Sequence, residues 1–232
     1  MPYLSSTGSV FGYGRAQLST TGAAPLPPST IRLNIVGDSS IASVAAGLAA
    51  ARTAQGYSNI TINYTSTLLN NYTGSNLTTA NFDVVLIYTN GGITFNSSIG
   101  TNLNSYISAG GPVVFGVFMW GNVSRLTNFT YTNSPYDYKG TQGNQTATMT
   151  KTVAHPITSN ISTSVAGSTY HTPTVTVQTN ATSIATFPDA TSMVAYQTGP
   201  RRVAVNLWPV VGTVNAYRLF LNAVLWAGGV LN

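Results

Sequence analysis

The stretch FDVVLIYTNGG, residues 82–92, decides the fold class of this chain. Its apolar run over 82–89 is nearly continuous, as expected of a strand whose two sheet faces are both covered. After Asn90-Gly91-Gly92 comes a helical pattern near 97–109, with Ile99, Leu103 and Ile107 on one face. Gly110-Gly111 ends that pattern, and PVVFGVF at 112–118 is a second buried run. Together these segments predict a strand, a helix and a second parallel strand.

Strand and helix patterns alternate on both sides of this unit. Upstream, a strand at 31–37, a helix over about 40–55 and a strand at 59–65 are predicted. In the turn after the first strand, the side chain of Asp38 or Ser39 can cap the helix. Downstream, the patterns predict strands at 174–179, 192–198 and 202–208, a further candidate strand at 183–187, and a helix over about 215–227. The expected class is α/β, with a doubly wound, mainly parallel sheet flanked by helices on both sides.

Two segments do not follow this alternation. Residues 1–30 are rich in Gly, Ser and Thr and end in a Pro cluster, which predicts an extended N-terminal arm and linker ahead of a domain over 31–232. The arm is either a terminus without a partner or a tether that contacts neighbouring subunits. The second segment is a long polar insertion at about 120–172, which is either functional or contains short strands of its own. The candidate assembly residues of the arm are Tyr3, Phe11, Tyr13 and Arg15.

The composition is poor in reactive groups. The 232 residues include no Cys, no Glu, four Asp, two Lys and two His, against 57 Ser and Thr and 21 Asn. The net charge of +5 is spread thinly along the chain, so we expect no nucleic-acid interface. No secretory signal peptide and no membrane-spanning stretch are predicted. Ten Asn-X-Ser/Thr sequons occur, about twice the number that the composition alone would produce.

Several strings, in this order and spacing, resemble the ThuA-like branch of the class I glutamine amidotransferase-like fold. They are FDVVLIYTNGG, LNSYISAGGPVVFGVF, AHPIT, RRVAVNLWP and RLFLNAVLWAGG, and they span about residues 31–229. The resemblance implies a flavodoxin-like sheet with a ligand site at the carboxyl ends of its central strands. At that edge it places Asp38, Ser39, Asn90, Gly91, Trp120, Asn122 and Trp208.

The resemblance also implies where a nucleophile would stand. Active glutamine amidotransferases carry a Cys on the turn after a central strand, activated by a His with a Glu behind it. Here the strand at 112–118 runs into Phe118-Met119-Trp120, and the chain contains neither Cys nor Glu. Amidotransferase chemistry is therefore excluded, and no GxSxG elbow for a Ser nucleophile appears.

Four residues are candidate ligand contacts: Asp38, Asn90, Trp120 and His171. Each has a structural alternative. Asp38 can instead cap a helix, and Trp120 can fill the core or an interface instead of stacking on a sugar. His155 and His171 lack the spacing of a metal site and are expected to cap turns or lie partly buried. We expect no catalytic residues, no cofactor and no metal.

Three functions remain in competition. The first is a non-enzymatic structural protein, a capsid-decoration or tail component of a virion, whose partners are other protein subunits in a homo-oligomer or a particle. The second is a carbohydrate-binding or adhesion module that uses Trp120, Tyr170 and the polar insertion. The third is a ThuA-like sugar-metabolising enzyme in which Asp38 works with a His or with Asp137. The expected location is a virion or an extracellular surface.

Overall fold

The computed structural model describes residues 29–90, 95–120, 126–137, 142–210 and 212–232. Their main feature is an eight-stranded sheet in the order β2-β1-β3-β4-β10-β9-β8-β6. The first five strands of this order are parallel, whereas β9, β8 and β6 join by antiparallel pairing. The strands are β1 (Ser29–Gly37), β2 (Ile60–Leu68), β3 (Val84–Ile87), β4 (Val113–Gly116), β6 (Thr150–Lys151), β8 (Thr182–Thr186), β9 (Ser192–Gln197) and β10 (Arg202–Val205).

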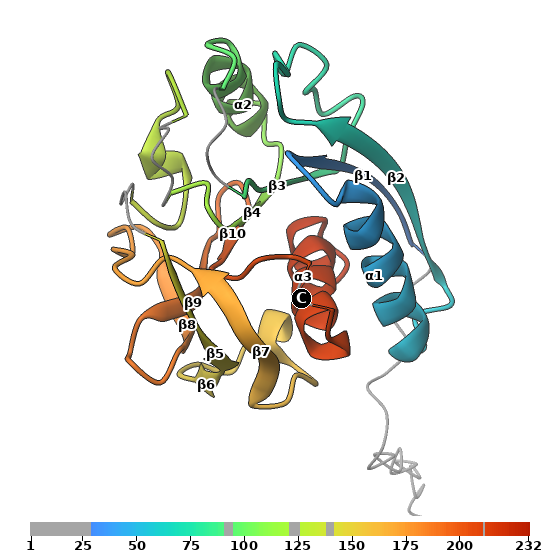
Figure 1. The fold of residues 1–232 in the computed structure, drawn as a ribbon. Coiled ribbons are helices and arrows are strands. Elements are labelled where there is room, and N and C mark those ends of the chain that lie inside the picture. The colour runs from blue at the N-terminus through green and yellow to red at the C-terminus, as the bar shows by residue number, and fades with distance from the viewer. Residues whose placement is uncertain (1–28, 91–94, 121–125, 138–141, 211) are drawn as a thin grey trace, which may run out of the picture.

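Helices cover both faces of the sheet (Figure 1). The helices α1 (Ile41–Ala54) and α3 (Val214–Ala227) pack on one face, and α2 (Ile99–Ser108) packs on the other. Along β3, Val84 and Leu86 join the core under α1 and α3, while Val85 and Ile87 join the core under α2. This two-sided burial explains the continuous apolar run and confirms the predicted doubly wound α/β fold.

The long insertion contains regular structure. Its strands β5 (Gly143–Thr148) and β7 (Ser164–His171) pair antiparallel as a separate two-stranded sheet, while its third strand, β6, joins the edge of the main sheet. Two short 3-10 helices, η1 (Tyr131–Asn133) and η2 (Pro156–Thr158), complete it. The interpretation that the polar stretch contains short strands is therefore correct.

Two local predictions are wrong. The alternating segment 174–179 forms only an isolated bridge between Val177 and Tyr136, because its backbone pairs with the irregular loop around 135–137. Helix α1 begins after Ser40, and no side chain caps it. The Asp38 carboxylate instead accepts hydrogen bonds from the neighbouring strand segment, from Thr89 Oγ1 at 2.8 Å and Asn90 N at 2.6 Å.

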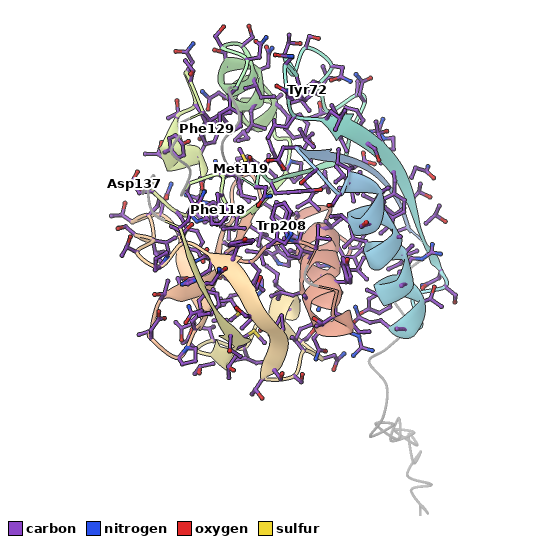
Figure 2. All side chains as sticks on the ribbon, in the orientation of Figure 1. Tyr72, Phe118, Met119, Phe129, Asp137 and Trp208 are labelled. Atoms are coloured by element: carbon purple, nitrogen blue, oxygen red, sulfur yellow. The ribbon has the colours of Figure 1, made fainter. Side chains whose placement is uncertain are left out.

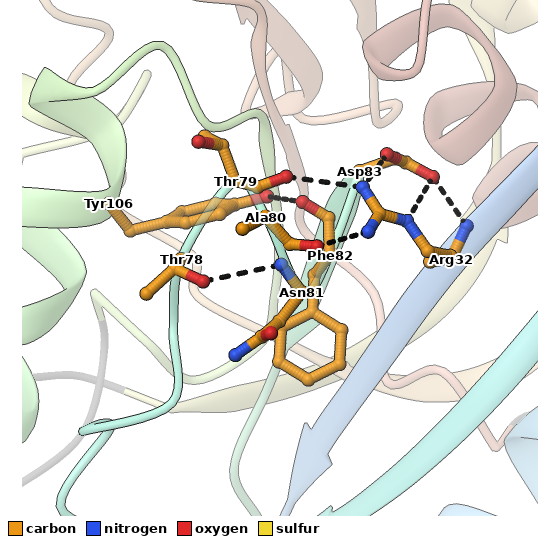
Figure 3. A network of polar contacts seen from close by, with 8 residues as sticks. All are labelled: Arg32, Thr78, Thr79, Ala80, Asn81, Phe82, Asp83 and Tyr106. Atoms are coloured by element: carbon orange, nitrogen blue, oxygen red, sulfur yellow. Dashed lines mark hydrogen bonds and ion pairs between the residues drawn. The ribbon is translucent and has the colours of Figure 1, made fainter.

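An ion pair joins β1 to the residue that directly precedes β3 (Figure 3). The Arg32 guanidinium donates to both carboxylate oxygens of Asp83, at 3.1 Å from Nε to Oδ2 and 2.5 Å from Nη2 to Oδ1. The same guanidinium also donates to the carbonyls of Thr79 and Ala80, so it holds the loop that enters β3. These hydrogen bonds lower the pKa of Asp83 and raise that of Arg32.

Other expectations concern the chain as a whole. Among the described residues, no helix combines the length and apolar character that crossing a bilayer requires. The proposed arm residues Tyr3, Phe11, Tyr13 and Arg15 lie outside the described residues.

Candidate functional site

The carboxyl ends of β1 and β3 form the topological switch point of the sheet. The connection from β1 runs through α1 to β2, and the connection from β3 runs through α2 on the opposite face to β4. In open α/β sheets, ligands bind in the crevice at such a point. Asp38 follows β1 and Asn90 follows β3, and the hydrogen bond from Asn90 N to Asp38 Oδ2 joins the two strand ends. The exposed Asn90 side chain remains available at the edge.

A row of four aromatic rings continues from the switch point across the same edge. The Tyr88 hydroxyl donates to the Ser39 carbonyl at 2.8 Å, and the Tyr88 ring meets the edge of Trp208 at 5.4 Å. Trp208 N donates to the Tyr170 carbonyl at 3.2 Å, and the Tyr170 ring lies 5.9 Å from Phe118. Burial, with the nearby charge of Asp38, raises the pKa of the Tyr88 hydroxyl, which keeps it a neutral hydrogen-bond donor.

A hollow of about 350 Å³ opens beside this row. Tyr170, whose side chain is 44% exposed, and the half-buried Trp208 supply its aromatic walls. The other walls come from the paired strands β5 and β7 and from the segment after β10. The lining residues are Asn144, Ser168, Thr169, Tyr170, Trp208 and Val210, none of which is charged.

The turn after β4 is filled with apolar side chains. Phe118, Met119 and Trp120 are 1%, 4% and 0% exposed. The Trp120 ring packs edge-on against Tyr136 at 5.0 Å, so the prediction of Trp120 as a ligand contact is wrong and its core-packing alternative is correct. Figure 2 shows Phe118, Met119 and Trp208 in the middle of the molecule, whereas Asp137 lies at the rim.

The two histidines lie apart from Asp38. His155 caps η2 by accepting from Ile157 N, and its ring packs against Tyr196 and Trp226. Trp226 lies near the carboxyl end of α3. Arg201 stacks on Trp226 and directly precedes β10, so this contact lies at the amino ends of the parallel strands. His155, which packs on Trp226, therefore lies at that edge of the sheet. The expected role of His155 as a turn cap is confirmed.

His171 is nearer to the carboxyl edge but enclosed. It is 3% exposed, its ring lies 5.0 Å from Phe187, and both of its ring nitrogens are buried. Burial lowers its pKa, which the charge of Asp189 and the backbone of Gly143 partly offset. The structure thus encloses His171 and does not present it at the edge beside Asp38 and Asn90, where it was expected as a ligand contact. The described residues also contain no group of three His, Cys, Asp or Glu side chains that could hold a metal ion.

Sequence reasoning located only part of this site. It named Asp38, Asn90, Trp208 and Tyr170, which the structure gathers at one edge, whereas Gly91 and Asn122 lie outside the described residues. It missed Asn144, Ser168 and Thr169, because these come from two strands whose pairing joins distant parts of a polar stretch. The first of these strands, GNQTAT, has Ala147 as its single apolar residue, so no apolar alternation marks it in the sequence.

Comparisons with known proteins agree with this architecture. No family model matches the chain, and no curated protein matches its sequence. Among solved structures, a ThuA-like protein from Bacteroides uniformis superimposes with a TM-score of 0.56 at 10% identity, over 90% of this chain and 94% of that one.

Two further solved structures give the same result. A ThuA-like protein from Parabacteroides merdae has a TM-score of 0.52 at 14% identity, over 89% of this chain and 92% of that one. A GMP synthase subunit from Thermoplasma acidophilum has a TM-score of 0.50 at 11% identity, over 86% of this chain and 94% of that one. At such identities the likeness concerns the fold alone. The chain thus has the flavodoxin-like α/β fold that ThuA-like proteins share with an amidotransferase component.

Proposed function

We propose that this chain is a non-enzymatic structural protein, a capsid-decoration or tail component of a virion, in which an amidotransferase-like domain is used as a rigid building block. The observation that carries the proposal is the burial of Phe118, Met119 and Trp120 in the turn after β4. In the related enzymes this turn presents the nucleophile to the substrate. Here the corresponding space is part of the hydrophobic core.

The state of the remaining titratable groups at this edge supports the same proposal. The Asp38 carboxylate is already bound by Thr89, Asn90 and Ser39. His155 lies at the opposite edge of the sheet, and His171 is enclosed against Phe187. A general acid or base must reach the proton that it transfers, and neither imidazole is placed beside Asp38 to do so.

The proposal of a virion role rests on the amino-acid composition of the chain. Only 6% of its residues are charged, and its polar groups are mainly hydroxyls and amides. Such a surface tolerates close contact with other subunits because few charges must be desolvated.

Mass spectrometry of purified particles from the source would test this role. We expect the chain in them at fixed stoichiometry with a coat or tail protein. Its absence from such particles would contradict the virion role. Measurable release of ammonia from glutamine by the purified chain would contradict the non-enzymatic role.

The hollow beside Tyr170 and Trp208 favours a second candidate, a carbohydrate-binding or adhesion module. Aromatic faces with amide and hydroxyl groups nearby bind neutral sugars without a charged side chain. The exposed Tyr170 ring and the amide of Asn144 supply both elements in one cavity.

A glycan array would test this candidate, with Tyr170→Ala and Tyr170→Phe as matched variants. Phe keeps the ring and removes only the hydroxyl, so Tyr170→Phe should keep binding that Tyr170→Ala loses. An array with no signal above background for the unmodified chain would rule this candidate out.

A further inference from the structure

The two edges of the main sheet are protected very differently. At one edge, β6 is only two residues long and contains Lys151, and the adjacent β8 pairs irregularly with β9. Short strands, lysines and bulges are the devices that prevent sheet edges from pairing with other chains. At the other edge, β2 is nine residues long and has the sequence ITINYTSTL, which contains no charge, no Pro and no Gly. Figure 1 shows β2 at the rim of the molecule, beside α1.

The side chains along β2 leave this edge open. Thr61, Asn63, Thr65 and Ser66 are exposed, and Leu68 at the end of the strand is 64% exposed. Within the described part of the chain, β2 pairs only with β1. A strand of this length with one unpaired side presents a row of backbone donors and acceptors that another strand can complete.

The outward face of α1, next to this edge, is also uncharged. Its exposed residues are Ala42, Ser43, Ala46, Ala50, Thr53 and Ala54. A solvent-facing helix surface normally carries charged side chains. The one charged residue of α1, Arg52, is half-buried and donates from Nη1 to the Ile60 carbonyl at 2.7 Å, at the start of β2. Small side chains allow a second helix to approach closely.

We propose that the β2 edge and the outward face of α1 form an interface with a second copy of this chain, in which two β2 strands pair antiparallel across a two-fold axis. In such an interface the same patch meets itself, so its charges would repel. The chain carries a net charge of +5, yet this patch carries no charged group except the bound Arg52. Pairing would join the two sheets into one. This inference rests on the proposed structural role and names its assembly surface.

The position of Ser29 fits this partner. Ser29, the first residue of β1, pairs with Ile60, the first residue of β2. Antiparallel pairing brings the start of β2 in one copy to the end of β2 in the other. Ile60 of each copy, with Ser29 beside it, would then lie opposite Leu68 of its partner, the most exposed of the large apolar side chains in the described residues.

Sedimentation velocity of the full chain over a range of concentrations would test the interface. Thr65→Lys/Ser66→Lys places two positive charges on the β2 edge, which would lie close to the same charges of the partner. We expect the dissociation constant to rise at least tenfold. Thr101→Lys/Ser108→Lys adds the same charge to the exposed face of α2, and this control should associate like the unmodified chain. Thermal unfolding of each variant would verify that it is folded.

Cross-linking would identify the chain that pairs with the β2 edge. Because the chain has no Cys, a single Thr65→Cys substitution can be linked by a short bis-maleimide only to another copy. We expect covalent dimers from Thr65→Cys and none from Thr101→Cys. Association without Thr65→Cys dimers would overturn the inference in favour of another occupant, such as residues 1–28 of a neighbour.

The remaining outcomes separate the two proposals. If the chain associates equally well with and without the β2 lysines, the interface is wrong but the structural role stands. A chain that is monomeric at every concentration overturns the interface, and its absence from purified particles would in addition overturn the structural role.

Discussion

Trp120 ends the turn after β4 with its indole fully enclosed and its edge against the Tyr136 ring. If it is a core residue, Trp120→Ala should lower the free energy of unfolding by about 3–5 kcal/mol, because it leaves a large cavity. Trp120→Phe keeps an aromatic ring there and should retain most of the stability. Urea unfolding of both variants would measure this. A fully stable Trp120→Ala chain would show that the side chain does not pack in the core.

Asp83 gives a residue-scale prediction for acid. Hydrogen bonds from Arg32 hold its folded-state pKa below the usual value, so its ionised form stabilises the fold. That contribution is complete above the unfolded pKa of about 3.9 and is lost as the pH falls through the lower folded pKa. Asp83→Asn should therefore flatten the loss of stability between about pH 4 and pH 2, measured by urea unfolding. An unchanged slope in Asp83→Asn over this pH range would contradict the stabilising role of the ionised Asp83 carboxylate.

At the scale of elements, sequence patterns predicted the helices and strands whose buried side chains recur at a regular spacing. It was possible to predict the continuous apolar runs of β3 and β4 and the apolar faces of α1, α2 and α3. Side chains that face the core must be apolar, so their spacing can be read from the sequence. The segment 174–179 has the same alternation, but Val175 and Val177 only pack against the core from an irregular loop. The strands β5 and β7 have mostly polar outer faces and pair across the intervening residues 149–163, a contact that no local pattern specifies. The polar walls of the hollow could not be predicted for the same reason.

The close packing of α1 against α3 depends on Gly47, which has no side chain. A Cβ at Gly47 would lie 2.1 Å from the Tyr217 ring. Gly47→Ala should lower the free energy of unfolding, because overpacking costs about 1–3 kcal/mol and exceeds the helix-propensity gain of about 1 kcal/mol. In a Tyr217→Ala background the same substitution should become stabilising, since the clash is gone. Urea unfolding of this double-mutant cycle measures the effect, and equal effects in both backgrounds would contradict the contact.

For the whole molecule, the few titratable groups make its response to mild acid simple. With no Glu and no Cys, the two imidazoles are the only side chains whose ordinary pKa lies between pH 5 and 8. Burial lowers both pKa values in the fold, and the positive charge of Arg201 lowers that of His155 further. Below about pH 6.5 the unfolded chain therefore binds more protons than the folded one. The fold should lose stability as the pH falls from 7 to 5.

His171→Leu and His155→Leu separate the two contributions to this loss. Each variant removes one imidazole, so each should lose less stability between pH 7 and pH 5 than the unmodified chain, and the double variant should change least. The His171 contribution should survive in His155→Leu, because the His171 ring packs on Phe187 and the His155 ring packs on Trp226, at separate places in the fold. Urea unfolding at several pH values provides the measurement. If the double variant lost as much stability as the unmodified chain, another group would have to titrate in this range, and the described imidazoles would not control it.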